Sequence, residues 1–282
     1  MNQTIITEIT QGLTTAFIDH TVSSNLAYRP QFVSNNYKEG RKVISSIEDE
    51  LLSCEQFAIS VAFITMSGIT PLLQTLKELE KRGIPGRILT TDYLTFSDPK
   101  ALRKLEEFSN LHVKMYVTDQ TEEGFHTKGY IFKKEEMYRI IVGSSNMTLS
   151  ALTVNREWNT RIVSTEQGEY AQSVLTEFED LWNSPQAIEF EQFIDSYTEN
   201  YTRNKIIRKQ KELARQEQIL SLEAYRLQPN SMQTGFINNL LKIYDAGEDK
   251  ALLISATGTG KTYASAFAMR ELGFRKVLFL VH

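Results

Sequence analysis

Short apolar runs of strand length alternate with segments of helical periodicity over more than half of this chain. Helices are expected at residues 37–52, 67–82, 99–108 and 168–182, and strands at 57–64, 87–91, 112–117, 125–132, 138–142 and 157–163. Strands that are covered by helices on both faces read as nearly continuous apolar runs, as these segments do. The alternation therefore predicts an α/β sandwich around a largely buried sheet.

The composition predicts a cytoplasmic protein with no membrane partner. The 282 residues suffice for one large or two medium domains, and 41% of them are hydrophobic and 23% charged. The single Cys54 excludes an internal disulfide framework and a cysteine-based zinc site, and fits a reducing compartment. No apolar run approaches the roughly 20 residues of a membrane span, and no secretory signal is recognisable. A net charge of −4 counts mildly against a dedicated non-specific DNA binder, although a phosphate site needs only a few cations.

A histidine and a lysine stand two residues apart at the start of the apolar run Phe125–Phe132. On a β-strand, residues i and i+2 point to the same face, so His126 and Lys128 are expected to project together. The imidazole can act as a nucleophile and the ammonium as a fixed cation. For an isolated pair, the alternative is a strand end with solvent-facing polar side chains. A similar pair, His112 and Lys114, has apolar neighbours that favour a structural role.

A tight turn with two hydroxyls and an amide follows the next apolar run. The turn consists of Gly143, Ser144, Ser145 and Asn146, and Glu157 opens the strand-like run that comes after it. Phosphodiester cleavage needs a nucleophile, proton transfer and groups that hold the phosphate oxygens. A His, a Lys, an Asn and a Glu on neighbouring strand ends supply these groups.

This ordered set of residues resembles the phospholipase D-like superfamily, especially its nuclease branch. The resemblance rests on His-x-Lys at 126–128, Gly-Ser-x-Asn at 143–146 and the glutamate Glu157, and covers about residues 35–185. Many members carry an Asp a few residues after the Lys, where this chain has Lys133. Nuclease members that lack this Asp use a Glu after the Asn, a role that Glu157 would fill.

The resemblance implies a two-step displacement without a metal. His126 attacks phosphorus to form a covalent phosphohistidine, while a second histidine protonates the leaving oxygen and then activates water. Lys128, Asn146 and the Ser144–Ser145 turn hold the non-bridging oxygens, and Glu157 orients or charges a histidine. Fixed cations thereby replace the metal ion of other phosphodiesterases. Because the family pairs such half-sites across a two-fold axis, we expect a homodimer with one composite site.

A glycine-rich loop stands between an expected strand and an expected helix further along the chain. The strand is expected at 251–254 and the helix at 263–272, with Ala-Thr-Gly-Thr-Gly-Lys-Thr between them. Loop N–H groups and a helix N-terminus favour an anion, so this context predicts binding of nucleotide phosphates. Lys261 would reach the β- and γ-phosphates of ATP, and Thr262 would hold Mg²⁺. The candidate ATP-binding residues of the loop are Gly258, Thr259, Gly260, Lys261 and Thr262.

This loop resembles motif I of superfamily 2 DEAD/DEAH-type helicases and restriction translocases, which tolerate Ser255 in place of the first glycine of the strict pattern. Upstream, Gln233 resembles the adenine-reading glutamine of such helicases. The alternative for Gln233 is a helix-capping turn ahead of a helix at 234–244. A second strand is expected at 276–282, and no Asp-Glu pair or second lobe follows it. We therefore expect a fragment of a longer protein, without ATP hydrolysis of its own.

These features predict four regions. They are an N-terminal extension at 1–36, a phospholipase D-like domain at 37–185, a helical linker at 186–225 and the start of a RecA-like helicase domain at 226–282. Nothing is assigned to the extension beyond a short strand or hairpin. Residues 203–215 of the linker hold six cations and one acid. A solvated connecting helix is expected there, and a DNA-contacting connector is the alternative.

The order of nuclease-like domain, linker and helicase start resembles ATP-dependent, modification-dependent (type IV) restriction endonucleases. The chain is therefore interpreted as the N-terminal part of such an enzyme, acting on DNA in defence against foreign DNA. A lipid-acting phospholipase D-like phosphodiesterase is disfavoured because no basic amphipathic membrane helix stands out. The alternative from a different class is a non-catalytic module for nucleic-acid binding or dimerisation, which would show salt-dependent DNA binding without cleavage.

Overall fold

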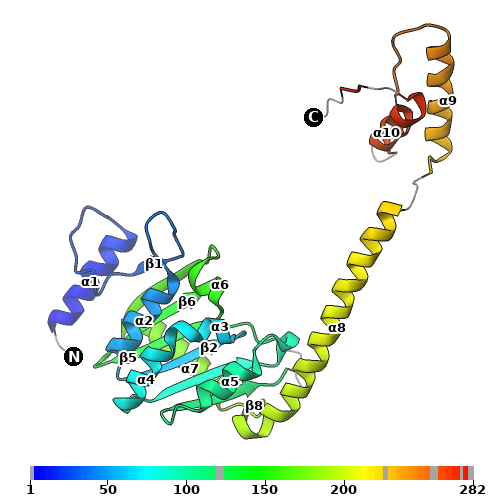
Figure 1. Ribbon diagram of the computed structural model, residues 1–282. Coiled ribbons are helices and arrows are strands. Elements are labelled where there is room, and N and C mark those ends of the chain that lie inside the picture. The colour runs from blue at the N-terminus through cyan, green and yellow to red at the C-terminus, as the bar shows by residue number, and fades with distance from the viewer. Residues whose placement is uncertain (1–2, 119–123, 225–227, 255–259, 274–275, 279–282) are drawn as a thin grey trace. The chain divides into compact units, whose positions relative to one another are not determined.

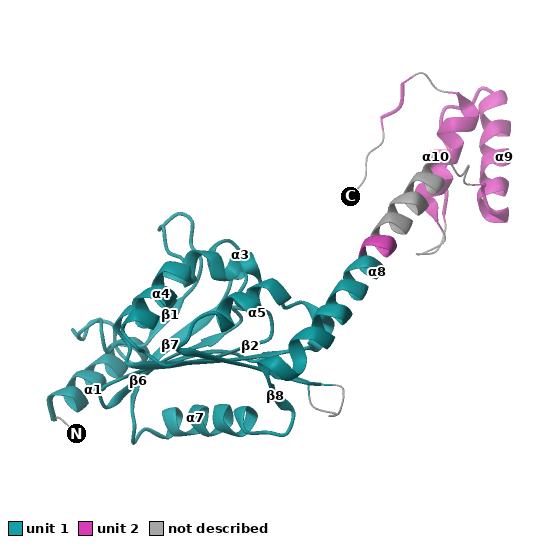
Figure 2. Cartoon of the chain, turned by 60° about the horizontal axis from the view of Figure 1, so that its bottom comes forward, with its two compact units in different colours: residues 1–208 teal, residues 209–282 magenta. Residues whose placement is uncertain are grey.

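The computed structural model describes residues 3–118, 124–224, 228–254, 260–273 and 276–278. The chain divides into two compact units, Met1–Arg208 (unit 1) and Lys209–His282 (unit 2), which are coloured separately in Figure 2. Unit 1 contains the sheet and the residues of the expected nuclease site. In the described ranges, no helix is long and apolar enough to cross a bilayer.

Unit 1 is built around one eight-stranded sheet with the order β1-β7-β6-β5-β2-β3-β4-β8 (Figure 1). β2, β3 and β4 run parallel to one another, and the other neighbouring pairs are antiparallel. The strands are β1 (Gln31–Val33), β2 (Gln56–Val61), β3 (Gly86–Thr91), β4 (Leu111–Tyr116), β5 (Lys128–Lys134), β6 (Met137–Gly143), β7 (Asn159–Thr165) and β8 (Ala187–Glu189).

Helices cover both faces of this sheet. α7 (Glu169–Trp182) lies on one face, and α3 (Met66–Ile69), α4 (Leu73–Lys81) and α5 (Pro99–Glu106) lie on the other (Figure 2). This layering confirms the predicted α/β sandwich. The other helices are α1 (Gln3–Phe17), α2 (Val43–Ser53), α6 (Leu149–Thr153), α8 (Phe190–Ala224), α9 (Ser231–Asp245) and α10 (Lys261–Leu272), with 3₁₀ turns η1 (Thr70–Leu72) and η2 (Tyr93–Thr95).

The core consists of one apolar cluster on each face of the sheet. Phe132 belongs to the same cluster as Leu51 of α2 and Leu102 of α5, whereas its neighbour Ile131 belongs to the cluster that contains Phe178 of α7. Successive residues of a strand point to opposite faces, so one apolar run supplies both clusters. Burial of a side chain of this size contributes about 1.5–3 kcal/mol, which is why the apolar runs determine the sheet.

The helix expected at 67–82 is interrupted. α3 and α4 are separated by the 3₁₀ turn η1, which holds Pro71. A proline ring fixes φ and removes a backbone donor, so the chain restarts its helix at this point. Thr65 begins α3 by accepting a hydrogen bond from the Gly68 N–H.

The N-terminal extension holds a helix where a strand or hairpin was the only expected element. In α1, hydroxyls of Thr7, Thr10, Thr14 and Thr15 donate to the carbonyls four residues earlier, which satisfies these polar side chains inside a helix. The buried Ile9 packs against β6 and β7. The extension also supplies β1, which pairs with β7 at the edge of the sheet.

The helix expected after the sheet begins within the core of unit 1. β8 pairs with β4 and leads directly into α8 (Figure 1). Phe193, Ile194 and Tyr197 in the first turns of α8 are buried, and the Tyr197 hydroxyl donates to the Ser97 carbonyl at 2.8 Å. The start of α8 is therefore fixed by packing.

Unit 2 contains α9 and α10, which pack through a small apolar cluster. The strands expected at 251–254 and from residue 276 are not formed, since residues 251–254 and 276–278 have no strand structure. Leu252 and Ile254 are 84% and 86% exposed. A parallel strand needs neighbouring strands and helices on both faces, which the described part of unit 2 does not provide. Residues 279–282 lie outside the described residues.

Candidate active site

Strand register brings the expected site residues to one edge of the sheet. Val61 at the end of β2 pairs with Lys128 at the start of β5, and Gly143 at the end of β6 pairs with Asn159 at the start of β7. β5 and β6 are antiparallel neighbours, so the start of one lies beside the end of the other. Residues from four separate chain segments can therefore meet at this edge.

His126 and Lys128 are in contact. The Lys128 Nζ lies 2.7 Å from His126 Nδ1 and 2.9 Å from the His126 carbonyl oxygen. β5 begins only at Lys128, so the pair meets because the lysine reaches back along the chain and not through strand alternation. His126 is exposed and Lys128 half-buried. Burial lowers the pKa of Lys128 below 10.5, and the nearby Glu157 carboxylate opposes this shift.

Thr127, between these two residues, anchors the segment to β2. Its hydroxyl shares a 2.6 Å hydrogen bond with that of Ser60, and its carbonyl accepts from the Ala62 N–H at 3.2 Å. The segment before β5 is therefore fixed from both its side chain and its backbone. Sequence reasoning missed Thr127 and Ser60, since neither belongs to a recognised motif.

Phe63 connects His126 with Asn146. The Phe63 N–H donates to Asn146 Oδ1 at 3.1 Å, and the Phe63 ring lies edge-on to the His126 ring at 6.1 Å between centroids. With Oδ1 held in this way, the amide nitrogen of Asn146 remains as the donor for a ligand. Phe63 was missed because a phenylalanine in an apolar run is indistinguishable from a core residue.

Buried hydrogen bonds stabilise the turn after β6. Ser145 is fully buried, and its hydroxyl accepts from Asn159 Nδ2 at 2.9 Å. The Tyr130 hydroxyl donates to the Ser145 carbonyl at 3.0 Å, and burial raises the pKa of Tyr130. The Ser145 side chain therefore supports the turn, which leaves the exposed Ser144 as the hydroxyl that a phosphate could reach.

Glu157 lies against this turn. Its carboxylate accepts a hydrogen bond from the Ser144 hydroxyl, which also accepts from the Trp158 N–H at 3.0 Å. In the described contacts its partner is thus a serine and not a histidine ring. The carboxylate also influences Lys128, so it contributes negative charge beside the lysine.

Residues 49–182 match a family model described as "Cardiolipin synthase, PLD-like domain". Unit 1 has a phospholipase D-like fold. Residues 226–282 match a second family model, "Type III restriction enzyme, res subunit". No curated protein matches the chain.

Several solved structures are similar to this chain. NucT from Helicobacter pylori is 15% identical, with 57% of this chain and 99% of that chain covered and a TM-score of 0.46. The phospholipase D family member Nuc from Salmonella typhimurium is 18% identical, with the same coverage and a TM-score of 0.45. The phosphatidylserine synthase of Haemophilus influenzae Rd KW20 is 15% identical, with 66% of this chain and 46% of that chain covered and a TM-score of 0.44.

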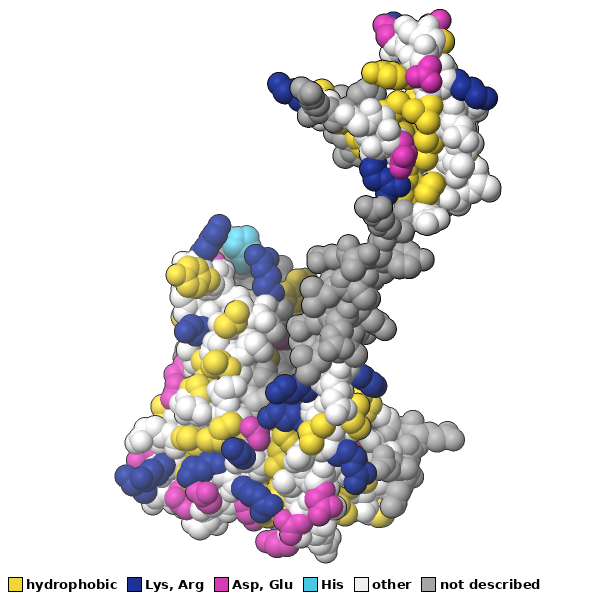
Figure 3. Space-filling view, turned by 45° about the vertical axis from the view of Figure 1, so that its right-hand side comes forward, with side chains coloured by type: hydrophobic (Ala, Val, Ile, Leu, Met, Phe, Trp, Pro, Cys, Tyr) yellow, Lys and Arg dark blue, Asp and Glu magenta, His cyan; other side chains and the backbone are white. Residues whose placement is uncertain are grey.

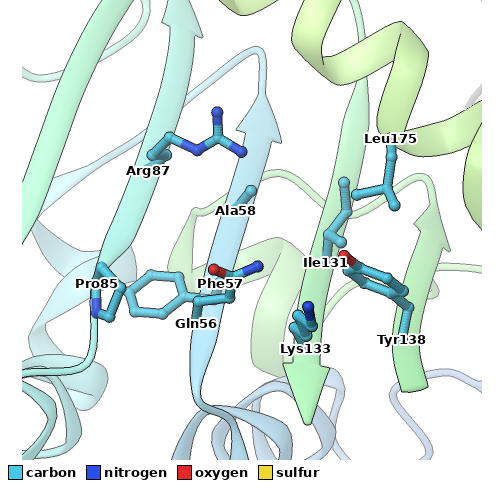
Figure 4. Close-up of a pocket in the computed structure, with 9 residues that line it drawn as sticks. All are labelled: Gln56, Phe57, Ala58, Pro85, Arg87, Ile131, Lys133, Tyr138 and Leu175. Carbon is cyan, nitrogen blue, oxygen red and sulfur yellow. The ribbon is translucent and has the colours of Figure 1, made fainter. Parts of the chain in front are cut away.

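Lys133 replaces the Asp that many phospholipase D-like domains carry, and it lies far from His126. It is at the opposite end of β5, where it pairs with Glu166 at 2.7 Å. Together with Arg87 and Tyr138 it lines a cavity of about 120 Å³ between the strands and α7 (Figure 4). None of the expected site residues lines this cavity.

The second His-x-Lys pair of the phospholipase D-like domain has a structural role. His112 and Lys114 of β4 both contact the Glu189 carboxylate of β8, at 2.5 Å and 3.0 Å. The Lys114 ammonium also lies 4.9 Å from the centre of the Trp182 ring. These contacts fix β8 to the sheet, as expected for a structural pair.

The glycine-rich loop is described only in part, because Gly258 and Thr259 lie outside the described residues. Gly260 has φ of +84° immediately before α10, and Lys261 and Thr262 stand in the exposed first turn of that helix. A left-handed φ at this point favours glycine. The placement fits a phosphate at the start of α10.

Gln233 contacts this loop directly. It forms a capping box with Asn230 at the start of α9, in which its Oε1 accepts from the Asn230 N–H at 2.9 Å. Its Nε2 donates to the Gly260 carbonyl at 3.1 Å. Both ends of its amide are therefore occupied within unit 2.

Among the described residues, no three His, Cys, Asp or Glu side chains are grouped so that they could hold a metal ion. The groups at the sheet edge that could hold a phosphate are the Lys128 ammonium, which can neutralise its charge, and the Asn146 amide, whereas the Ser144 hydroxyl already donates to Glu157. This donor set is suited to phosphate oxygens.

Proposed function

We propose that the phospholipase D-like domain cleaves DNA phosphodiester bonds without a metal, through a covalent phosphohistidine at His126. The observation that carries the proposal is the grouping of His126, Lys128 and Asn146 at one sheet edge, with Phe63 in contact with both His126 and Asn146. These three residues supply a nucleophile and two groups that can hold the phosphate oxygens in a metal-free displacement at phosphorus.

Phosphate binding would activate the histidine. In the free site the Lys128 ammonium lies against His126 Nδ1, and a phosphate oxygen would compete for it. The freed imidazole forms a nitrogen–phosphorus bond while the bond to the leaving oxygen breaks, and a second histidine gives that oxygen a proton. This second histidine then takes a proton from water as the water attacks phosphorus and releases His126.

A homodimer would supply the second histidine. The described part of the chain offers one His126-type half-site, and a two-fold axis would bring a second copy of it to the same phosphate. Sedimentation velocity at the concentrations used for cleavage tests this point. Cleavage by a monomer would contradict the composite site.

The match of residues 226–282 to a restriction enzyme subunit supports a wider role. We infer that the nuclease works with an ATP-driven motor in a modification-dependent (type IV) restriction enzyme of the cytoplasm, directed against foreign DNA. ATP would bind at Gly260, Lys261 and Thr262, with Mg²⁺ on Thr262.

A second candidate function is DNA binding without cleavage. The contact between Glu157 and Ser144 favours it, because this carboxylate is the proposed replacement for the Asp that Lys133 displaces, and it is not paired with a histidine. Under this reading Lys128 and Asn146 only contact phosphates.

Incubation of the purified protein with plasmid DNA in EDTA tests the proposal. The wild type is expected to cut, and His126→Ala to lose at least about a thousandfold in rate, because loss of a nucleophile removes the covalent route. His20→Ala is the matched control, since it removes an exposed histidine of the N-terminal extension and should leave cleavage intact. Salt-dependent binding without any cleavage would instead favour the second candidate.

A further inference from the structure

The loop after β3 holds two residues in an unfavourable backbone conformation. Leu94 and Thr95 have φ of +56° and +46°. A positive φ is costly for residues with a Cβ and especially for a β-branched threonine. Such strain persists only where the surroundings hold it, and it concentrates at functional sites.

Helix α8 supplies the contacts that hold this loop. The Arg208 guanidinium donates to the Leu94 carbonyl and, at 3.3 Å, to the Thr95 hydroxyl. Asn204 Nδ2 donates to the same hydroxyl at 3.0 Å. The Arg208 guanidinium also lies 4.1 Å from the centre of the Phe96 ring, in cation–π range.

From Phe96 an aromatic series leads to the candidate nucleophile. The Phe96 ring lies edge-on to Phe63 at 5.1 Å, and Phe63 lies edge-on to His126 at 6.1 Å. Phe63 also donates its N–H to Asn146. His126 therefore contacts the ring that rests on Phe96, and Asn146 accepts from the backbone N–H of the same residue.

A second contact ties α8 to the same region. The Tyr197 hydroxyl donates to the Ser97 carbonyl, and the Ser97 hydroxyl accepts from the Ile64 N–H at 3.1 Å, next to Phe63. α8 thus touches the segment after β3 at several successive residues. Displacement of this part of α8 would release Leu94, Thr95 and Phe96 together.

Charge on α8 does not by itself explain these contacts. In the space-filling view, basic side chains are interspersed with acidic ones over the lower part of unit 1 and do not form one large patch (Figure 3). Arg208 is directed at a backbone carbonyl and an aromatic ring of its own unit. The contacts of Arg208 are therefore with residues of unit 1 itself.

We propose that Arg208 and Asn204 of α8 are positioning residues for the phospholipase D-like site, which they control through the strained loop, Phe96 and Phe63. The proposal rests on the nuclease function in so far as it concerns catalysis. The position of His126 then depends on α8, and the site residues are aligned only while the start of α8 is packed against the sheet of unit 1.

Cleavage kinetics give the first test. Arg208→Ala is expected to lower kcat by up to about a hundredfold, as for a displacement of about an ångström at the reacting group, with KM within about twofold. Phe96→Leu, which removes the ring but no charge, should behave alike, and Arg208→Lys should not restore the rate because an ammonium cannot both stack and donate in this geometry. Arg203→Ala, an exposed arginine of the same helix, is the matched control. A higher KM with unchanged kcat would mean that Arg208 contacts DNA, and would overturn the proposal.

The imidazole signals of histidine-labelled protein give a test that does not depend on cleavage. The His126 signal, assigned with His126→Ala, is expected to shift in Arg208→Ala and in Phe96→Leu, but not in Arg203→Ala, while the His112 signal stays in place. If the wild type fails to cut DNA yet the signal shifts, the nuclease function fails and the positioning role stands. An unchanged signal in both variants, with folding verified by circular dichroism, would overturn the positioning role.

Discussion

At the scale of single residues, Lys128 combines two opposing requirements. In the proposed mechanism its ammonium must stay charged to hold a phosphate, yet burial lowers its pKa below 10.5, and the Glu157 carboxylate counteracts this shift. A lysine whose pKa is lowered in the folded protein loses its charge at a lower pH than a free lysine. The site therefore becomes less able to bind phosphate as the pH rises.

We expect cleavage by the wild type to decline with rising pH before pH 10.5 is reached, because Lys128 deprotonates early. In Lys128→Arg the guanidinium stays charged at these pH values, so this alkaline limb should disappear even if the overall rate is lower. The measurement is the pH profile of kcat/KM for both proteins. The same limb in Lys128→Arg would assign it to another group.

Residue spacing predicted which side chains carry the candidate chemistry, but not what positions them. His126, Lys128 and Asn146 were identified because their order along the chain matches a known pattern, and they do lie at one edge. Phe63 and Asn159 were missed, since a core phenylalanine and a buried asparagine carry no signal before the register of β2 and β7 is known. Positioning groups depend on tertiary contacts that a single sequence does not specify.

At the scale of elements, the β5–β6 hairpin contains a strained turn. Lys134 pairs with Met137, which leaves two residues in the turn, and the first of them, Glu135, has φ of +53°. Two-residue hairpin turns with a positive φ at the first position favour glycine there. A glycine at position 135 would therefore relieve this backbone strain.

Glu135→Gly is expected to raise the free energy of unfolding of unit 1 by about 1 kcal/mol, because glycine adopts a left-handed φ without penalty. Glu136→Gly, at the other turn position, should instead destabilise by roughly 0.5–1 kcal/mol through backbone entropy. Urea unfolding followed by circular dichroism measures both. Equal effects of the two substitutions would show that the turn is not strained.

A buried ion cluster joins α2 to the antiparallel part of the sheet. Glu50 of α2 is 5% exposed and lies 3.0 Å from Arg161 of β7 and 3.6 Å from Arg139 of β6. Burial raises the pKa of Glu50 despite both arginines, and lowers the pKa of Arg161. The charges are thus tolerated because they are mutually paired.

Glu50→Ala is expected to lower the free energy of unfolding by about 3–5 kcal/mol, because it leaves two buried arginines without their partner. Asp49→Ala, which removes the exposed acid next to it, should change stability by less than about 0.5 kcal/mol. Thermal and urea unfolding check the pair. A loss of unfolding free energy as small for Glu50→Ala as for Asp49→Ala would mean that water reaches the ion cluster.

Hydrophobic periodicity predicted most elements of the sheet and its covering helices, because these segments bury one continuous face or both. It failed for α1, whose threonine-rich sequence is satisfied by hydrogen bonds to its own backbone. It also failed for β8, whose three residues are too few to show a pattern. The apolar run at 251–254 read as a strand although it has no strand partner in the described part of unit 2.

At the scale of the whole molecule, a phospholipase D-like domain and a segment that matches a restriction enzyme subunit occur in one chain. In the second, Gln233 uses both ends of its amide within the protein, on Asn230 and on Gly260. It therefore connects Gly260 with the start of α9. Reading of an adenine by this side chain would require it to give up one of these bonds.

Gln233→Ala is expected to weaken the binding of ATP and the binding of GTP to a similar extent, by about tenfold. The reason is the loss of the hydrogen bonds of the Gln233 amide with Asn230 and Gly260. Fluorescent nucleotide titrations of the whole chain measure both affinities. Gln228→Ala, an exposed glutamine just before α9, is the matched control. Loss of ATP binding with GTP unchanged would instead identify Gln233 as an adenine reader.

The contact of Phe63 with His126 and Asn146 also bears on the order in which the chain folds. Phe63 is synthesised before His126 and Asn146, the two site residues that it contacts. β5, β6 and β7 follow one another in the chain, so they can pair through contacts between residues that are close in sequence. The junction of β2 with β5 closes a much longer stretch of chain. The antiparallel strands can therefore pair locally, and the residues of the candidate site are aligned only when β2 has joined β5.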